Sequence, residues 1–222
     1  MKTLKPKTVP CKNCRKRIEP KGNSSLSQYC EAVDCQDARI KKALEKGRQH
    51  IKKQIKEVDR NHREWRKDAI DKLKTLSDWK NDLQYWINYI VRLIDKDVPC
   101  IATGATTGKR NAGHRFSVGS NDTIRFHLCN IHVQSEHSNK WKGGDNDRYT
   151  EGLLKMYGQE YTDYVLSLNQ TPKIDLSKEE IKEKIVIAKQ IVKQLKDDDF
   201  TYCTEQRIDM RKKFNERLGI YK

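Results

Sequence analysis

The sequence has no apolar run of about 18 residues, the length that a helix needs to cross a bilayer, so no membrane span is expected. Residues 1–14 also lack the apolar stretch of a secretory signal. Hydrophobic residues make up 35% of the 222 residues and charged residues another 35%, which is too little apolar material for one large core. We therefore expect small cores joined by solvated helices, in a protein of the cytoplasm.

Acidic residues are scarce relative to basic ones, because 31 Asp and Glu face 46 Lys and Arg and give a net charge of +15. The imbalance is concentrated in residues 1–74, where 22 basic residues face 10 acidic ones. A surplus of this size in one region indicates a polyanionic partner, most simply nucleic acid. A basic helical face that is merely solvated is the alternative interpretation.

Seven cysteines are present, and in a reducing compartment metal binding is more common than disulfide formation. Four of them follow the spacing C-x2-C-x15-C-x4-C, namely Cys11, Cys14, Cys30 and Cys35. Two thiolate pairs on tight turns supply the four soft ligands of a tetrahedral zinc site. We predict a structural zinc finger over residues 1–36 whose folding depends on the metal, with four unrelated thiols as the alternative.

The next segment, residues 37–96, is predicted to be helical and basic. Residues 37–74 contain no proline and a single glycine, and apolar residues recur there at helical spacing: Ile40, Leu44, Ile51, Ile55, Val58, Trp65 and Leu73. This pattern predicts a long helix with a thin apolar seam, which would serve as a coiled-coil segment in a homodimer or as an arm lying along DNA. A second helix is expected from an N-cap at Ser77 to about Ile94.

The segment 98–145 carries the residues of greatest chemical interest. His114 is expected near the end of a β-strand, because it lies between two glycine-containing turns, and Asn130 follows sixteen residues later. An isolated histidine is more often structural, but an imidazole followed by asparagine is the residue set of a one-metal DNA nuclease. Basic side chains suited to phosphates surround it: Arg115, Arg125, Lys140 and Lys142.

The C-terminal third of the chain is predicted to be helical. One is expected from Asn146 to Tyr157, ended by Gly158, and another over residues 160–168. Ser177 and Glu180 form a capping box that opens a helix to about residue 195, and a last helix is expected over 204–218. Residues 171–222 are therefore predicted to form a C-terminal helical region.

Several motifs taken together resemble the lambdoid phage NinG (Rap) recombination nucleases, relatives of the HNH or His-Me finger endonucleases. The resemblance covers most of the chain. The motifs that carry it are the N-terminal cysteine finger, Asp97-Val98-Pro99-Cys100, Ala112-Gly113-His114, Arg125-Phe126, Asn130-Ile131-His132-x-Gln134, Lys142-x-Gly144, Tyr149 and Tyr157-Gly158-Gln159-Glu160.

The resemblance implies an α+β, mostly α protein with a small ββα-metal nuclease domain over residues 97–170. It implies hydrolysis of branched DNA, such as D-loops or Holliday junctions, in the bacterial host of a phage. His114 would be the general base, and Asn130 would brace the loop and orient the histidine. The third motif position falls at Asn139 or Trp141.

The chain departs from its relatives at the zinc knuckles of this domain. Relatives carry C-x2-C at both knuckles, whereas these positions read Cys100 and Thr103, then Ser135 and Ser138. We therefore predict no second zinc, and expect hydrogen bonds and apolar packing in its place.

The ligands for a catalytic Mg²⁺ or Mn²⁺ are also reduced. The residues expected to bind such an ion are Asn111, Asn139 and His137, a set poor in charge. The alternative function is therefore a DNA-binding recombination accessory protein that cleaves weakly or not at all.

Overall fold

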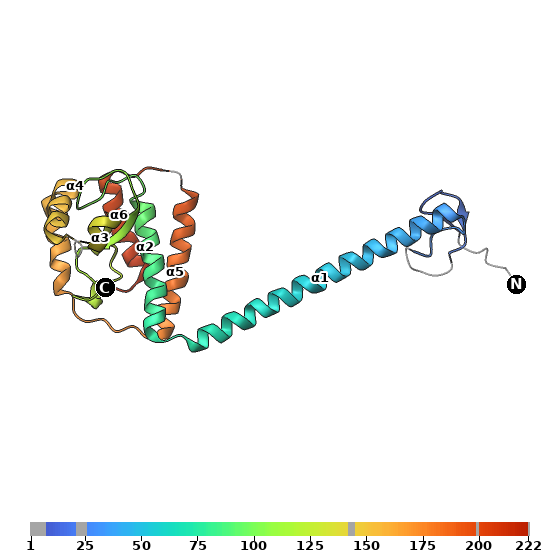
Figure 1. Cartoon of the computed structure of the whole chain (residues 1–222), viewed down its shortest axis with the longest axis horizontal. Helices are drawn as coiled ribbons and strands as arrows, with labels where there is room; N and C mark the ends of the chain where they lie inside the picture. The colour runs from blue at the N-terminus through green and yellow to red at the C-terminus, as the bar shows by residue number, and fades with distance from the viewer. Residues whose placement is uncertain (1–7, 21–25, 142–144, 199, 222) are drawn as a thin grey trace. The chain divides into compact units, whose positions relative to one another are not determined.

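A computed structural model describes residues 8–20, 26–141, 145–198 and 200–221, without the side chains of Lys140 and Trp141. The chain divides into two compact units, residues 1–73 and residues 74–222. The fold is α+β and mostly helical, as expected (Figure 1). In the described ranges no helix combines the length and apolar composition that spanning a bilayer requires.

The first unit contains a small hairpin and one long helix. Strand β1 (Val9–Pro10) pairs antiparallel with β2 (Arg17–Ile18), and helix α1 (Val33–Leu73) continues for 41 residues without interruption. Cys35 is the buried residue of α1, and the large apolar side chains farther along the helix are exposed. The long basic helix predicted for residues 37–74 is thus present and begins four residues earlier.

The second unit begins with α2 (Leu76–Ile94), which packs along α5 (Lys178–Asp197). The N-cap of α2 is Thr75, so the predicted cap at Ser77 was wrong. Both residues can accept a backbone hydrogen bond, but Thr75 alone has an acidic residue three positions later to complete a capping box. The Asp78 carboxylate accepts from the Thr75 backbone N–H at 2.8 Å, and the Asp78 N–H donates back to the Thr75 hydroxyl at 3.2 Å.

The capping box predicted for the later helix is confirmed. The Ser177 hydroxyl accepts from the Glu180 N–H at 3.2 Å, and the Glu180 carboxylate accepts from the Ser177 N–H at 2.8 Å. The last helix, α6 (Thr204–Leu218), lies over the residues expected and ends at Gly219 in a left-handed conformation.

A two-stranded sheet and a short helix form a ββα hairpin inside this unit. Strand β3 (Arg110–His114) pairs antiparallel with β4 (Ile131–Ser135), and α3 (Glu136–Trp141) follows directly. Two short 3-10 helices precede β4, η1 (Asp122–Ile124) and η2 (Leu128–Asn130). The hairpin therefore presents the end of β3 and the start of β4 next to each other, with His114 opposite Ile131.

Helix α4 (Asn146–Ser167) runs through both predicted segments and is followed by η3 (Leu168–Gln170). Gly158 has φ 82° and ψ 175° inside it, so the helix is kinked at the glycine where a break was expected. A positive φ of this kind is accessible to glycine at little cost.

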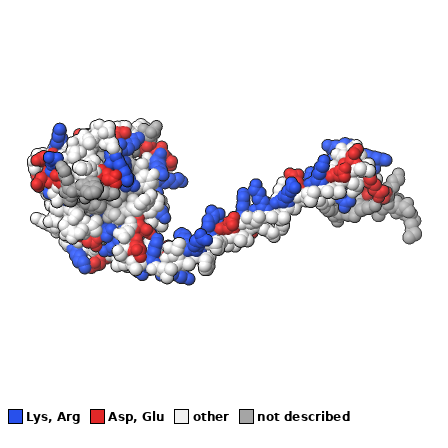
Figure 2. Space-filling model, viewed as in Figure 1, with Lys and Arg blue, Asp and Glu red and all other residues white. Residues whose placement is uncertain are grey.

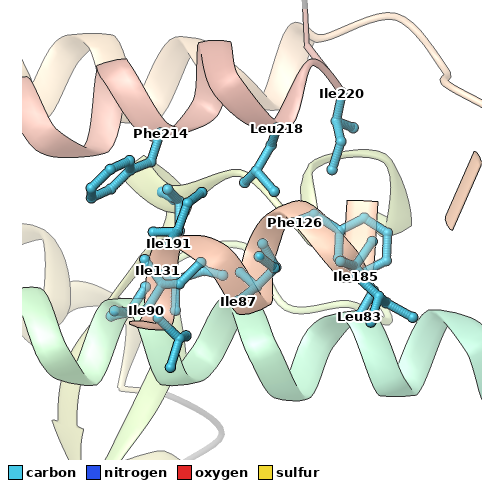
Figure 3. Close-up of a cluster of buried hydrophobic side chains, with 14 of the residues drawn as sticks. Leu83, Ile87, Ile90, Phe126, Ile131, Ile185, Ile191, Phe214, Leu218 and Ile220 are labelled. Carbon is cyan, nitrogen blue, oxygen red and sulfur yellow. The ribbon is translucent and has the colours of Figure 1, made fainter. Parts of the chain in front are cut away.

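The larger core lies among α2, α5, α6 and the hairpin (Figure 3). Its labelled side chains are Leu83, Ile87, Ile90, Phe126, Ile131, Ile185, Ile191, Phe214, Leu218 and Ile220. Since α2 and the C-terminal helices share this core with the hairpin, residues 74–222 form one compact unit. This division differs from the predicted ranges 37–96, 97–170 and 171–222.

Candidate functional site

The N-terminal cysteines lie together at the start of the first unit. One sulfur from each of Cys11, Cys14, Cys30 and Cys35, the cysteine quartet, lies within 4.8 Å of the other three. The hairpin β1–β2 brings the first pair into a turn, and the start of α1 supplies Cys35. The quartet can hold a metal ion such as zinc, because four thiolates at this separation match a tetrahedral sulfur site.

Hydrogen bonds to sulfur support this assignment. The Cys30 backbone N–H donates to the Cys11 sulfur at 3.3 Å, and the Asn13 amide donates to the Cys35 sulfur at 3.5 Å. Burial alone would raise the pKa of the Cys11 thiol, but backbone hydrogen bonds lower it to about 6. Donors aimed at the Cys11 sulfur favour its thiolate, which is the form that binds metal. The Asn13 amide acts in the same direction on Cys35, but the neighbouring thiols and burial outweigh it and raise the pKa of Cys35 to about 12.

In the second unit, His114 occupies the last position of β3 and is half-buried. Its Nε2 lies 3.0 Å from the backbone carbonyl oxygen of Arg125. A carbonyl only accepts, so Nε2 carries the proton and Nδ1 holds the free electron pair. No hydrogen bond to this Nδ1 comes from the part of the chain that the structure describes.

The imidazole of His114 is held in its neutral form. Burial lowers its pKa below the ordinary value of 6.5, the hydrogen bond to the Arg125 carbonyl opposes that shift, and the Arg125 charge adds to it. A neutral ring with a free Nδ1 can accept a proton at neutral pH.

Asn130 is fully buried and joins the two sides of the loop between β3 and β4. Its side-chain oxygen accepts from the Phe116 N–H at 2.9 Å, while its amide donates to the carbonyls of Phe116 and Ile124 at 3.1 and 3.3 Å. In addition, the Arg115 N–H donates to the Asn130 backbone carbonyl at 2.8 Å. These bonds fix the chain that follows His114.

The four positions where related proteins carry knuckle cysteines also lie together and are connected by hydrogen bonds. They are Cys100, Thr103, Ser135 and Ser138. The Ser135 N–H donates to the Cys100 sulfur at 3.1 Å, the Ser138 hydroxyl lies 3.7 Å from that sulfur, and the two serine hydroxyls are 3.0 Å apart. Burial would raise the pKa of the Cys100 thiol, but hydrogen bonds from Thr103, Ser135 and Ser138 lower it to about 7. We call this group the Cys100 cluster.

The three residues considered for a catalytic cation do not converge. Successive residues of a strand face opposite sides, so Asn111 and His114 lie on opposite faces of β3. His137 and Asn139 are two positions apart in α3, and such positions do not face one another. Among the described residues, the cysteine quartet is the one place where three or more His, Cys, Asp or Glu ligand atoms lie together.

The basic residues expected near the site have different surroundings. Arg115 is half-buried and donates to the Thr150 hydroxyl at 2.9 Å. Arg125 is buried, and its guanidinium donates inside the fold to the side chains of Gln84, Asp122 and Asn81. Its role in the structure is therefore to hold η1 against α2.

The remaining two basic residues of the prediction cannot be placed. Lys142 lies outside the described residues, and the side chain of Lys140 does as well.

A buried hydrogen-bond chain behind the hairpin was not foreseen from the sequence. The Tyr149 hydroxyl donates to the Gly113 carbonyl at 3.0 Å, so it accepts from Nδ1 of His132 at 3.0 Å. The other nitrogen of His132 then accepts from the Tyr161 hydroxyl at 3.1 Å. Burial lowers the pKa of His132 well below 6.5, so this histidine is a neutral structural link between β4 and α4.

A buried ion pair that contacts the middle of β4 was also not predicted from the sequence. Arg211 and Asp95 are both fully buried, with 2.6 Å between Nη2 and Oδ2. The same carboxylate oxygen accepts from the Val133 N–H at 3.1 Å, and Nε of Arg211 donates to the Leu128 carbonyl at 3.3 Å. The 116 residues that separate the partners left no local signal in the sequence.

Comparison with known proteins gives consistent results. A NinG protein of Escherichia phage lambda is 34% identical over 96 residues, which are 43% of this chain and 47% of that protein. The NinG protein of Enterobacteria phage H19B is also 34% identical over 96 residues, 43% of this chain and 48% of its own. The NinG protein of Salmonella phage P22 is 33% identical over 87 residues, 39% of this chain and 43% of its own.

The chain spans about half the length of these curated relatives. No solved structure matches it. A family model described as "Bacteriophage Lambda NinG protein" matches residues 3–198. Because that match extends over most of the chain, the protein belongs to the NinG family.

Proposed function

We propose that the protein is a structure-selective DNA endonuclease that hydrolyses branched DNA, such as D-loops and Holliday junctions, during phage recombination. The observation that carries the proposal is the state of His114 at the end of β3. Its ring is neutral, Nε2 is fixed by the Arg125 carbonyl, and Nδ1 is free to act as a base. Membership of the NinG family and the ββα hairpin are in accord with this role.

In the proposed reaction, Nδ1 of His114 takes a proton from a water molecule as the water oxygen attacks a backbone phosphorus. The bond from that phosphorus to one sugar oxygen breaks, and the leaving oxygen takes up a proton from solvent. Asn130 keeps the loop after β3 in place, so the imidazole is already oriented when DNA binds. Arg115, which is half-buried and donates to the Thr150 hydroxyl, is proposed to contact a phosphate, whereas Arg125 acts inside the fold.

A divalent cation, Mg²⁺ or Mn²⁺, would stabilise charge on the phosphate and the leaving oxygen when bound. The described side chains around His114 do not assemble a ligand set for it, because Asn111 faces away and His137 and Asn139 diverge. We therefore assign no step to the cation.

The cysteine quartet is proposed to hold one structural zinc ion. Four thiolates close the coordination sphere, which leaves no open position for a substrate. In this proposal the metal supplies folding energy to a segment that has little apolar core of its own.

DNA is the proposed partner, in the cytoplasm of a bacterial host. Figure 2 shows Lys and Arg along one edge of α1. By helical spacing, one side of α1 carries five exposed residues that we name the basic face: Lys42, Lys53, Lys56, Arg60 and Lys67. Their spacing along one side of a helix suits contacts with a phosphate backbone.

The competing function is a DNA-binding accessory protein without cleavage. Among the described residues, His, Cys, Asp and Glu ligand atoms converge at the cysteine quartet and not beside His114, which is the observation that favours it. Binding would then rest on the basic face, and His114 would be a structural residue.

The two functions are separated by incubating the full chain with a labelled four-way junction and a labelled D-loop. Mg²⁺ or Mn²⁺ is added or omitted without a chelator, so that zinc stays in the quartet. Cleavage by the wild type but not by His114→Ala, with equal junction binding by both, supports the nuclease. His50→Ala, which removes an exposed imidazole of α1, is the matched control and should cleave normally.

Binding by the wild type without cleavage in either cation contradicts the nuclease and selects the accessory protein. Zinc content and circular dichroism of His114→Ala show whether that variant is folded. A folded His114→Ala that still cleaves would overturn the role of His114.

A further inference from the structure

Helix α1 exposes a continuous row of uncharged side chains. Ile40, Leu44, Ile51, Ile55, Val58 and Trp65 each expose between 55% and 65% of their surface. Together with Gly47, His62, Ala69 and Leu73 they form the row that we call the seam. Most of the stability of a protein helix comes from packing of its apolar face, so we expect this row to pack against an apolar partner.

The seam has a regular period and is separate from the basic face. Ile40, Ile51, His62 and Leu73 follow one another at eleven-residue intervals. This period keeps a row on one side of two nearly straight helices that wind with a slight right-handed supercoil. Figure 2 shows uncharged residues along one edge of α1 and Lys and Arg along the other, so a partner on the seam leaves the basic face free.

We propose that the seam pairs with the seam of a second copy of this chain, and that the two helices run antiparallel. The register is centred between Ile55 and Val58. It places these pairs opposite one another: Ile40 with Leu73, Leu44 with Ala69, Ile51 with His62, and Ile55 with Val58, and it sets Gly47 one residue away from the level of Trp65.

Side-chain size selects the antiparallel arrangement. Gly47 is the gap in the seam, and nothing in the structure lies within 4 Å of the place where its Cβ would be. Trp65 is the largest seam residue and is 64% exposed. Antiparallel pairing sets the indole beside the glycine, whereas parallel pairing would crowd two indoles and leave a void between two glycines.

Charge selects the same arrangement. Residues 33–53 of α1 carry seven Lys and Arg against three Asp and Glu, whereas residues 54–73 carry six against five. Antiparallel pairing lays the strongly basic half beside the half that contains more acids. Parallel pairing would lay the two strongly basic halves side by side, at a cost in repulsion.

The arrangement has a consequence for the dimer. In each copy, residues 74–222 follow directly after the C-terminal end of α1. In an antiparallel pair, the two C-terminal ends of α1 lie at opposite ends of the paired helices. A helix of 41 residues is about 60 Å long. The pairing does not depend on cleavage, because it concerns residues 33–73 alone.

Photocrosslinking of the full chain tests the direction. Leu44 is replaced by p-benzoylphenylalanine, and the crosslinked peptides of a mixture of light and isotope-labelled protein are sequenced. Crosslinks between copies that reach the peptide around Ala69 are expected. Crosslinks to the peptide around residue 44, or to residues 74–222, would overturn the proposal. The probe at Gln49, on the opposite side of α1, is the control and should join no copies.

A double-mutant cycle tests the contact between Gly47 and Trp65. Sedimentation should show that Gly47→Leu and Trp65→Ala each weaken the dimer. The double variant should be at least about tenfold tighter than the two single effects predict together. A parallel pair predicts that Gly47→Leu fills a void and tightens the dimer with no such coupling. A wild-type chain that remains monomeric at micromolar concentration would overturn the proposal outright.

Discussion

The cysteine quartet and the Cys100 cluster each bring together four side chains from separate segments of the chain. The quartet has four sulfurs within 4.8 Å, whereas the Cys100 cluster has one thiol and three hydroxyls joined by hydrogen bonds. The quartet stands in a segment with two-residue strands, while Cys100 belongs to a buried cluster with residues of α4. If the quartet holds zinc as proposed, the metal would support that segment as the packed core supports the Cys100 cluster.

The strongest test of this difference is loss of the metal from the quartet. Cys14→Ser removes one ligand on an exposed side chain, and we expect the zinc to be lost. Structural zinc contributes about 10–16 kcal/mol in small fingers, so residues 8–35 should unfold and become sensitive to protease. Zinc analysis and limited proteolysis measure both effects. Cys203→Ser, another exposed thiol, is the control; an unchanged zinc content in Cys14→Ser would contradict the assignment.

The converse experiment turns the Cys100 cluster into a metal site. A variant that combines Thr103→Cys, Ser135→Cys and Ser138→Cys is expected to bind a second zinc per chain. Zinc binding should raise the free energy of unfolding of this variant by about 5 kcal/mol. This is less than the contribution expected at the quartet, because the hairpin is already folded without metal. Elemental analysis gives the count. One zinc in the folded variant would mean that the cluster geometry no longer suits a metal.

Removal of the buried ion pair tests how much the core supports the Cys100 cluster. Arg211→Ala leaves Asp95 buried without its partner and should destabilise residues 74–222 by about 3–5 kcal/mol. Denaturant unfolding measures this loss, while the zinc content should stay unchanged. Arg217→Ala, whose side chain bonds exposed glutamines, serves as the control. Equal stability of the two variants would show that the ion pair does not support the hairpin.

The smallest effect concerns pH. Hydrogen bonds lower the pKa of Cys100 from 9.0 to about 7, so the folded state favours the thiolate. The stabilisation is complete above pH 9 and is lost as the pH falls through 7, with a size of about 1 kcal/mol after solvent screening. Unfolding measured from pH 6 to 9.5 should show stability rising with pH, and Cys100→Ala should abolish that rise. A flat profile in the wild type would argue against the thiolate.

The sequence predicted the features that depend on near neighbours. Periodicity located α1, the Ser177 and Glu180 spacing located the start of α5, and Gly158 marked the kink in α4. The cap of α2 was misplaced by two residues because Ser77 and Thr75 are both good acceptors and only their third neighbours distinguish them.

Contacts between distant residues could not be predicted in the same way. Arg125 was expected at a phosphate because its charge is visible in the sequence, while its partners Gln84 and Asn81 lie more than forty residues away. The pairing of Arg211 with Asp95 depends on how α6 crosses the end of α2. The sequence singled out His114 as the candidate base. That its Nδ1 is the free nitrogen follows only from the structure, in which Nε2 donates to the Arg125 carbonyl.

The hydrogen-bond chain behind the hairpin constrains how this sequence can change over evolutionary time. Tyr161 donates to His132, His132 donates to Tyr149, and Tyr149 donates to the Gly113 carbonyl, so these four groups are satisfied only as a set. Replacing one ring would leave a buried donor or acceptor without its match, a loss of about 1–3 kcal/mol. Viable descendants should therefore keep all three rings or replace them in concert.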